Sequence, residues 1–184
     1  FDGGMETRAL ERLKLETRLR RALEKSEFEV HYQPQIDISS RGLIGAEALI
    51  RWTDPELGPV SPGIFIPVAE ASGLIVGIGQ WVLREVCRQI LVWQAAGHVV
   101  PRIAVNLSFL QFRRPDFLDT VKAILHEAGV KGDQLEFELT ESVVMHDAEQ
   151  AISILAQLRE LGIELAIDDF GTGYSSLNRL KRMP

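Results

Sequence analysis

Residues 134–169, QLEFELTESVVMHDAEQAISILAQLRELGIELAIDD, contain the pattern of a strand, a helix and a second strand. Alternating apolar residues in Gln134–Thr140 predict the first strand, and the apolar residues of Ile163–Asp168 predict the second. Between them, Asp147 can cap a helix with apolar residues at helical spacing, and Gly162 can end it. Elements of these lengths join as parallel strands connected by a helical crossover.

The same unit occurs earlier in the chain. Arg102–Leu107 predicts a strand, and Pro115–Ala128 predicts a helix that Gly129 can end. Further upstream the pattern predicts strands at Phe28–Asp37 and Leu43–Trp52. It also predicts a helix start at Ser61–Pro62 and a helix at Gly79–Ala96 that Gly97 closes. Three consecutive strand–helix units indicate a parallel sheet, either open and doubly wound or closed into a barrel. No glycine-rich loop follows the first strand, which weakens the nucleotide-binding alternative.

The first residues predict a separate, charged helix. Glu6–Lys25 has leucines along its length and no glycine or proline. We expect residues 1–26 to form a linker helix from an upstream region, because Phe1–Gly4 has the character of the tail of a preceding segment. The apolar residues of this helix can dock on the domain that follows or pair with another chain.

Composition restricts the class of protein. With 184 residues, 46% hydrophobic and 25% charged, the chain has the size and balance of one globular domain. Its net charge of −6 argues against binding to duplex nucleic acid, although divalent cations can neutralise an acidic phosphate-binding pocket. The single cysteine, Cys87, favours a reducing, cytoplasmic setting and a buried core position rather than a reactive thiol. No apolar run has the length of a membrane span, so any membrane tether is expected outside these residues.

Polar side chains lie at the ends of three neighbouring predicted strands. Asn106, Glu138 and the pair Asp168–Asp169 follow apolar strand residues at spacings of 32 and 30 residues. The carboxyl ends of parallel strands share one edge, and that edge carries the catalytic groups of (β/α) barrels. Each residue has a structural alternative, since Asn106 and the aspartates can cap the next segment and Glu138 can lie on a solvated face. Three strands with polar residues at the same edge favour a shared site.

The side-chain types at this edge indicate a hard cation. Carboxylate and amide oxygens, with no cysteine or histidine at these strand ends, favour Mg²⁺ or Mn²⁺ over zinc. The adjacent carboxylates of Asp168 and Asp169 repel each other unless a cation or proton separates them, which favours two ions of the kind that cleave phosphodiesters. The glycine-rich residues 170–176 that follow predict a flexible loop controlling the site.

Glu47 lies within a mainly apolar predicted strand, where an unpaired carboxylate is costly. Arg51 is four residues further on and therefore lies on the same face of that strand. Its guanidinium can form an ion pair with Glu47 or bind a phosphate through two parallel hydrogen bonds. The sequence leaves both possibilities open.

Five motifs together resemble the EAL family, in the order and spacing that the family shows. They are YQP at Tyr32–Pro34, EALIRW at Glu47–Trp52, NLS at Asn106–Ser108, ELTES at Glu138–Ser142 and DDFGTGYSSL at Asp168–Leu177. The resemblance covers about Phe28 to Pro184. It implies an α/β fold of the TIM-like (β/α)8 barrel type whose first strand is antiparallel to the others. It also implies hydrolysis of cyclic di-GMP to linear pGpG with Mg²⁺ or Mn²⁺.

The resemblance further implies roles for individual residues. The implied metal ligands are Glu47, Asn106, Glu138 and Asp168, with Asp169 on a second metal. Glu47, Asp168 and Asp169 are the implied catalytic residues, and the implied substrate contacts are Gln33, Leu49 and Arg51, with Arg51 on a phosphate. Glu141 is the implied anchor of the flexible loop, which comprises Phe170, Gly171, Thr172, Gly173, Tyr174, Ser175 and Ser176.

The chain stops before the strands in which the family carries a lysine that assists the attacking water, a further metal-binding glutamate and a glutamine. We therefore expect residues 27–184 to be an EAL domain that lacks its C-terminal strands. The expected partners are cyclic di-GMP, a second copy in a homodimer and an upstream regulatory domain of the GGDEF or sensor type. The alternatives are a receptor that binds cyclic di-GMP without cleaving it and a protein–protein interaction module.

Overall fold

The structure is a computed structural model that describes residues 3–25, 27–140 and 148–168. For Asp168 it describes the backbone. The predicted second-metal ligand Asp169, the loop anchor Glu141 and the loop at residues 170–176 lie outside the described residues, as does the predicted helix cap Asp147.

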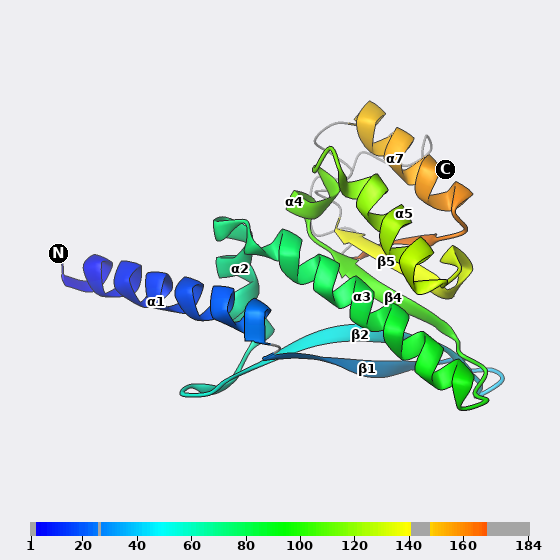
Figure 1. The fold of residues 1–184 in the computed structure, drawn as a ribbon, viewed down its shortest axis with the longest axis horizontal. Helices are drawn as coiled ribbons and strands as arrows, with labels where there is room; N and C mark the ends of the chain where they lie inside the picture. The colour runs from blue at the N-terminus through cyan, green and yellow to red at the C-terminus, as the bar shows by residue number, and fades with distance from the viewer. Residues whose placement is uncertain (1–2, 26, 141–147, 169–184) are drawn as a thin grey trace.

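One mixed sheet organises the described residues (Figure 1). Its main strands, in the order in which they pair, are β1 (Phe28–Ile36), β2 (Leu43–Asp54), β4 (Arg102–Leu107), β5 (Leu135–Thr140) and β6 (Glu164–Asp168). β1 is antiparallel to β2, whereas β2, β4, β5 and β6 are parallel to one another. A short strand, β3 (Gly58–Val60), returns antiparallel along the end of β2. The predicted parallel sheet with an antiparallel first strand is confirmed, and the described strands form an open sheet.

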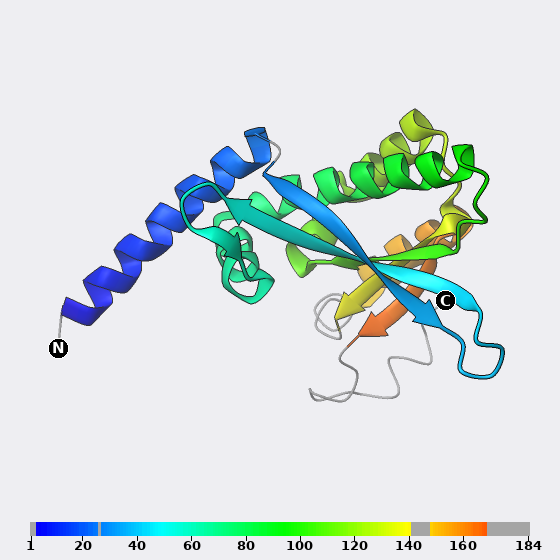
Figure 2. The same cartoon turned by 90° about the horizontal axis from the view of Figure 1, so that it is seen from below.

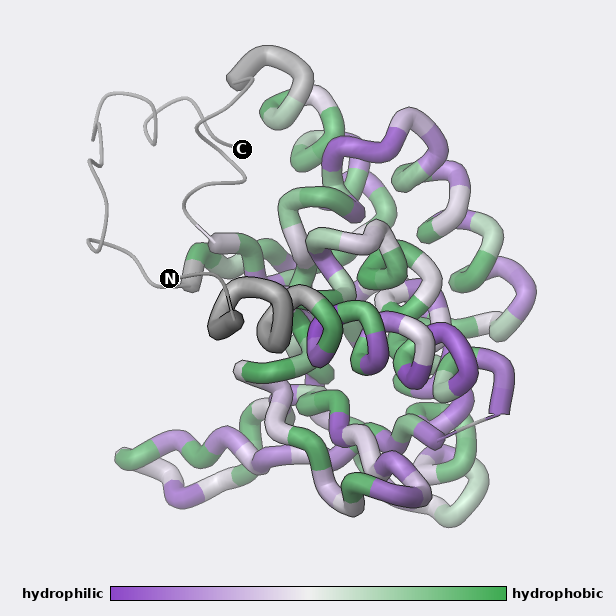
Figure 3. The backbone as a smooth tube through the Cα atoms, turned by 90° about the vertical axis from the view of Figure 1, so that its left-hand side faces the viewer, coloured by the Kyte–Doolittle hydropathy of each residue, from purple (hydrophilic) through white to green (hydrophobic). Residues whose placement is uncertain are grey.

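One face of the sheet is apolar and is covered by helices. α3 (Leu74–Ala95) contacts β1 and β4, α5 (Phe117–Ala128) packs beside α3, and α7 (Ala148–Glu160) contacts β6. In Figure 2, α3 and α5 lie above the strands. The strand residues that point towards these helices are among the most buried in the chain, including Ile103, Val105, Leu135, Phe137 and Leu139. In Figure 3, hydrophobic and hydrophilic stretches alternate along the helical coils, as expected for helices with one face on a core.

Cys87 lies in this core and not at the surface. It is a free cysteine on α3 and is fully buried. Burial raises the pKa of its thiol to about 11. The predicted core position is therefore confirmed, and the thiol carries little of the thiolate character that reactive cysteines need.

The opposite face of the sheet is polar. Successive side chains of a strand alternate between faces, and residues opposite each other in the register share a face. By this register, one face carries Gln33 and Gln35 of β1, Glu47, Leu49 and Arg51 of β2, Arg102, Ala104 and Asn106 of β4, Glu136, Glu138 and Thr140 of β5, and Glu164, Ala166 and Asp168 of β6. At the amino-terminal end of these strands, Arg102 pairs with Glu136 at 3.8 Å and Glu164 at 3.7 Å. This single face therefore carries ion pairs at the amino-terminal end of the strands and acidic residues towards their carboxyl end.

The helices between β3 and β4 differ from the prediction. α2 (Pro62–Ser72) begins with Ser61 as N-cap and Pro62 in its first turn, as predicted. It ends at Gly73, whose φ of 76° lies in the left-handed region, and α3 starts directly after it at Leu74. The prediction of a helix beginning at Gly79 was wrong, because glycine lowers helix propensity without preventing a helix that tertiary packing supports. The remaining predicted boundaries lie within a few residues of the observed ones.

Besides the three-residue strand β3, two short helical elements had no counterpart in the prediction. They are the single-turn helix α4 (Phe109–Phe112) and the 3₁₀ turn η1 (Gly132–Gln134). Both are too short to show a helical repeat of apolar residues, and repetition is the signal on which a helix prediction depends. α4 matters for the site because it follows β4 directly.

The N-terminal helix α1 (Gly3–Lys25) projects from the body of the molecule and docks by its C-terminal half (Figure 1). Leu19 and Ala22 are fully buried, and α1 contacts α2 and α3. Nearer its start, Leu10 and Leu13 are 53% and 59% exposed. Of the two predicted possibilities for this helix, docking on the domain is therefore observed for its second half.

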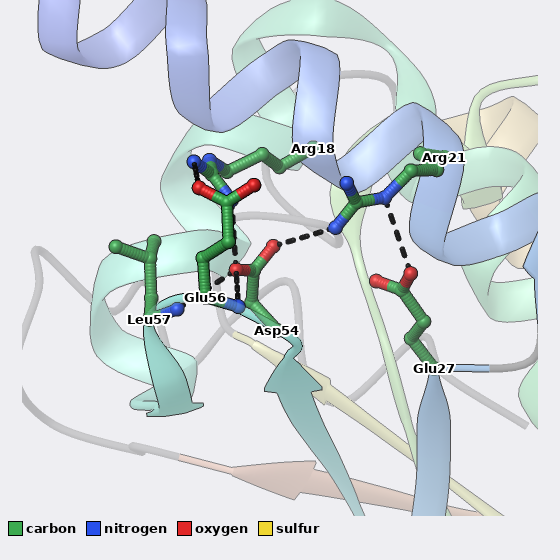
Figure 4. A network of polar contacts seen from close by, with 6 residues as sticks. All are labelled: Arg18, Arg21, Glu27, Asp54, Glu56 and Leu57. Atoms are coloured by element: carbon green, nitrogen blue, oxygen red, sulfur yellow. Dashed lines mark hydrogen bonds and ion pairs between the residues drawn. The ribbon is translucent and has the colours of Figure 1, made fainter.

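A buried carboxylate fastens α1 to the end of β2 (Figure 4). Asp54 is 1% exposed, and its two carboxylate oxygens accept hydrogen bonds from Arg18 Nη1 at 2.8 Å and Arg21 Nη2 at 3.1 Å. The backbone N–H groups of Glu56 and Leu57 each donate to Asp54 Oδ1 at 2.9 Å. Four donors thus satisfy one buried carboxylate and join the helix to the turn after β2.

Candidate active site

The site is built around a contact between β2 and β4. Asn106 Nδ2 donates a hydrogen bond to Glu47 Oε1 at 2.8 Å. Glu47 is half-buried within β2, and Asn106 is the next-to-last residue of β4. The amide nitrogen can only donate, so this contact directs the Asn106 oxygen, an acceptor, away from Glu47. Two of the predicted metal ligands, 59 residues apart in sequence, therefore lie side by side.

The sheet places the next two predicted ligands in neighbouring strands. Glu138 of β5 is the register partner of Asn106, and Asp168 of β6 is the register partner of Thr140. Asp168 is the last residue of its strand. The backbone thus brings Asn106, Glu138 and Asp168 to the carboxyl end of three adjacent parallel strands, as predicted.

The predicted substrate contacts lie on the same polar face. Gln33 of β1 is exposed and is the register partner of Glu47, while Leu49 and Arg51 follow Glu47 on β2 and are half-buried. Arg51 Nη1 donates to the carbonyl oxygen of Ile50 at 2.9 Å. Within residues 27–140, no ion pair joins Arg51 to Glu47. The first of the two possibilities for Arg51, an ion pair with Glu47, is therefore not observed. The guanidinium keeps donors for a ligand.

A cavity of about 640 Å³ opens between this part of the sheet and helices α2 and α3. Its lining includes Leu49 and Arg51 from β2, Asn106 from β4, Ser108 from the following loop and Glu70 from α2. Apolar residues of α2 and α3, among them Ile66, Ile75 and Val82, form another wall. A mainly apolar cleft with a few convergent polar groups is the usual form of a small-molecule site.

Sequence analysis missed Glu70 and Gln111. Glu70 Oε1 accepts a hydrogen bond from Ser108 Oγ at 2.8 Å, which ties α2 to the loop after Asn106. Gln111 Oε1 accepts from the Ser108 N–H at 3.2 Å and completes a capping box at the start of α4. One signal for Glu70 was available, because it is the single charged residue of the apolar helix α2. A signal for Gln111 was also available, because Ser108 followed three residues later by Gln111 is the pattern of a capping box; its contact with Gly79 of α3 has no local pattern.

The donors at this edge suit a divalent metal such as Mg²⁺ or Mn²⁺. Glu47 and Glu138 supply carboxylates and Asn106 an amide oxygen, which are the ligands of hard cations. Among the described residues, no group of three or more His, Cys, Asp or Glu side chains is close enough to hold a metal ion. Two of the five predicted ligands, Asp168 and Asp169, have side chains outside that description. The side chains of Glu47, Asn106 and Glu138 are the described part of the predicted ligand set.

The comparison with known proteins gives the family. The family model of the EAL domain matches residues 16–184. The chain belongs to the EAL domain family. One relative is MucR of Pseudomonas aeruginosa, named a bifunctional diguanylate cyclase/cyclic di-GMP phosphodiesterase, which is 47% identical over 184 residues. Another is NbdA of the same species, named a cyclic di-GMP phosphodiesterase, which is 42% identical over 184 residues.

The fold also matches EAL structures. The structure of PaMucR phosphodiesterase in complex with c-di-GMP superposes with a TM-score of 0.88 at 47% identity, covering 93% of this chain and 69% of that chain. The alignments with MucR and NbdA cover 100% of this chain but 27% and 24% of those proteins. The chain therefore spans about a quarter of the length of these curated relatives. None of the described helices is by itself long and apolar enough to cross a membrane, although α2 and α3 together, bent by 119°, pass that test by length and composition.

Proposed function

We propose that this EAL domain hydrolyses the second messenger cyclic di-GMP to linear pGpG in a metal-dependent reaction. The observation that carries the proposal is the Asn106–Glu47 hydrogen bond at the edge of a cavity large enough for a ligand. Glu138 and Asp168 occupy the next two strands along that edge. Relatives named as cyclic di-GMP phosphodiesterases, together with a related structure in complex with c-di-GMP, support the choice of substrate.

The predicted site residues divide into two groups in this proposal. Glu47, Asn106, Glu138 and Asp168 would hold one metal ion, and Asp169 would hold a second. Gln33, Leu49 and Arg51 hold the substrate, with the Arg51 guanidinium on a phosphate. When bound, divalent ions lower the pKa of a coordinated water and offset charge on the phosphate. The apolar wall from α2 and α3 excludes bulk water and thereby strengthens the contact between Arg51 and a phosphate.

Turnover by the purified full-length protein that contains this domain tests the proposal. With Mg²⁺ or Mn²⁺ present, cyclic di-GMP should be converted to pGpG, and a chelator should stop the reaction. Absence of turnover with either metal, at a protein concentration where the dinucleotide binds, would contradict hydrolysis. The alternative function would then be a receptor that binds cyclic di-GMP without cleaving it. If calorimetry detects no binding of metal and no binding of cyclic di-GMP, the remaining alternative is a protein–protein interaction module.

The setting of the domain is also part of the proposal. We infer that residues 1–26 connect the EAL domain of residues 27–184 to an upstream regulatory domain, because the related proteins are about four times longer. The exposed Leu10 and Leu13 of α1 are available to a second copy in a homodimer. We place the activity in the cytoplasm. Glu141 as the anchor of the loop at residues 170–176 stays a prediction.

A further inference from the structure

Gln111 is a buried amide that occupies the space beside Gly79. Among the described residues, Asp54 and Gln111 are the two polar or charged side chains that are buried, and Gln111 is 7% exposed. A Cβ atom on Gly79 would lie 1.8 Å from Gln111 Nε2 and 2.5 Å from its Cδ. Gly79 is therefore required for the close approach of α4 to α3, and the buried amide needs hydrogen-bond partners to offset its desolvation.

The buried amide holds the loop that leaves β4. Gln111 Oε1 accepts the Ser108 N–H, and Ser108 Oγ accepts the Leu110 N–H at 3.3 Å. The same Ser108 hydroxyl donates to Glu70 Oε1 of α2. Ser108 is thus fixed by α2 on one side and, through Gln111, by α3 on the other.

Ser108 lies two residues after Asn106, whose amide holds Glu47. Because Ser108 follows the last residue of β4, a displacement of Ser108 would move the strand end that carries Asn106. Displacements of about 1 Å at a distance from the reacting groups can cost about 100-fold in rate. We propose that Gln111, seated against Gly79, is a positioning residue that sets the orientation of Asn106 towards Glu47 and the metal. This inference rests on the proposed metal site.

Two glycines on α3 provide a matched pair of test variants. Gly79→Ala and Gly77→Ala make the same change two residues apart, and each removes a helical glycine that costs about 1 kcal/mol relative to alanine. A Cβ on Gly77 would meet Leu23 Cδ2 of α1 at 2.9 Å, the far end of a flexible side chain. Gly77→Ala therefore controls for helix propensity and for crowding of α3, without touching Gln111.

Mn²⁺ titration of the full chain by calorimetry is the main measurement. We expect Gly79→Ala to weaken Mn²⁺ affinity about 10–100-fold, the usual effect of losing a group that orients a ligand, and Gly77→Ala to change it less than about twofold. In the metal-free protein, the NMR signals of the Asn106 side-chain amide should shift in Gly79→Ala alone. Equal Mn²⁺ affinities in the two variants overturn the inference. If Gly79→Ala does not fold, Gln111→Ala takes its place, with the same expected loss.

A double variant separates positioning from packing. In Gly79→Ala/Gln111→Ala the overlap is relieved, so the thermal midpoint should recover towards that of the unmodified chain while Mn²⁺ affinity stays low. Recovery of both would assign Gln111 a packing role and overturn the inference. An unmodified chain that binds no Mn²⁺ would overturn the proposed function and this inference together. If the unmodified chain binds Mn²⁺ normally and Gly79→Ala binds it equally well, the positioning role of Gln111 is overturned while the proposed function stands.

Discussion

Strand β2 carries two carboxylates seven residues apart, on opposite faces of the sheet, and their surroundings differ. Asp54 is buried and accepts hydrogen bonds from two arginines and two backbone N–H groups. Glu47 is half-buried beside Asn106, which lines the cavity and donates a hydrogen bond to it. A carboxylate accepts about four hydrogen bonds, so Asp54 is saturated by the fold, whereas Glu47 retains acceptor capacity.

The difference indicates two separate tasks for acidic residues of one strand. Saturation by donors makes a buried carboxylate a structural link, because removal of either partner leaves an uncompensated polar group. A carboxylate that retains acceptor capacity, next to a residue that lines a cavity, is suited to binding a cation. The four predictions that follow test this contrast.

The largest effect is expected for Glu47→Gln. Glutamine keeps an oxygen that can accept the Asn106 N–H, but it loses the charge that a hard cation requires. We expect turnover of cyclic di-GMP to fall to the background of the assay, with a thermal midpoint within about 4 °C of the unmodified chain. Kinetic assays and thermal melts check this, and near-normal turnover would remove Glu47 from the metal site. Asp168→Asn should behave in the same way.

Asp54→Ala should affect stability rather than chemistry. It leaves two backbone N–H groups without their acceptor and removes one of two carboxylate partners from each arginine, and we expect a loss of about 3 kcal/mol in the free energy of unfolding. Turnover per folded molecule should stay within a few-fold of normal, because the cavity residues are unchanged. Urea unfolding followed by an activity assay measures both quantities. A loss of less than about 1 kcal/mol would show that α1 does not depend on this link.

Acid should weaken the Asp54 link selectively. Burial alone would raise the pKa of Asp54, but the N–H groups of Leu57 and Glu56 and the Arg18 guanidinium outweigh burial and hold this pKa below its ordinary value of 3.8. A lowered pKa in the folded state means that the stabilisation is fully present above pH 3.8 and is lost as the pH falls through the folded-state pKa. The stability difference between the unmodified chain and Asp54→Asn should therefore be constant near neutral pH and shrink below pH 3.8. A difference that grows on acidification would contradict this assignment.

The smallest effect is expected for Glu56→Ala. Glu56 also pairs with Arg18, but its side chain is 65% exposed, whereas that of Asp54 is fully buried. Exposed ion pairs contribute about 0–1 kcal/mol, so the free energy of unfolding should change by about 0.5 kcal/mol or less. Urea unfolding beside Asp54→Ala gives the comparison within one network. Equal losses in the two variants would show that burial does not distinguish these acceptors.

The sequence predicted the sheet and the edge that carries the site because both depend on repeated local signals. Apolar strand residues ending in Asn106, Glu138 and Asp168, one strand–helix unit apart, were sufficient to place these residues on adjacent parallel strands. The start of α3 was not predictable, because Gly79 weakens a helix locally and is explained only by Gln111 packing against it. The hydrogen bonds to Asp54 likewise join α1 to a turn 36 residues away, which no local pattern contains.

Anomalous diffraction from crystals of the full chain grown with Mn²⁺ tests the central claim most directly. The account predicts a Mn²⁺ peak bounded by the carboxylates of Glu47 and Glu138 and the amide oxygen of Asn106, and none beside Asp54, whose acceptors are already occupied. A map with Mn²⁺ bound elsewhere and Glu47 still hydrogen-bonded only to Asn106 would contradict the assignment of this strand edge as the metal site.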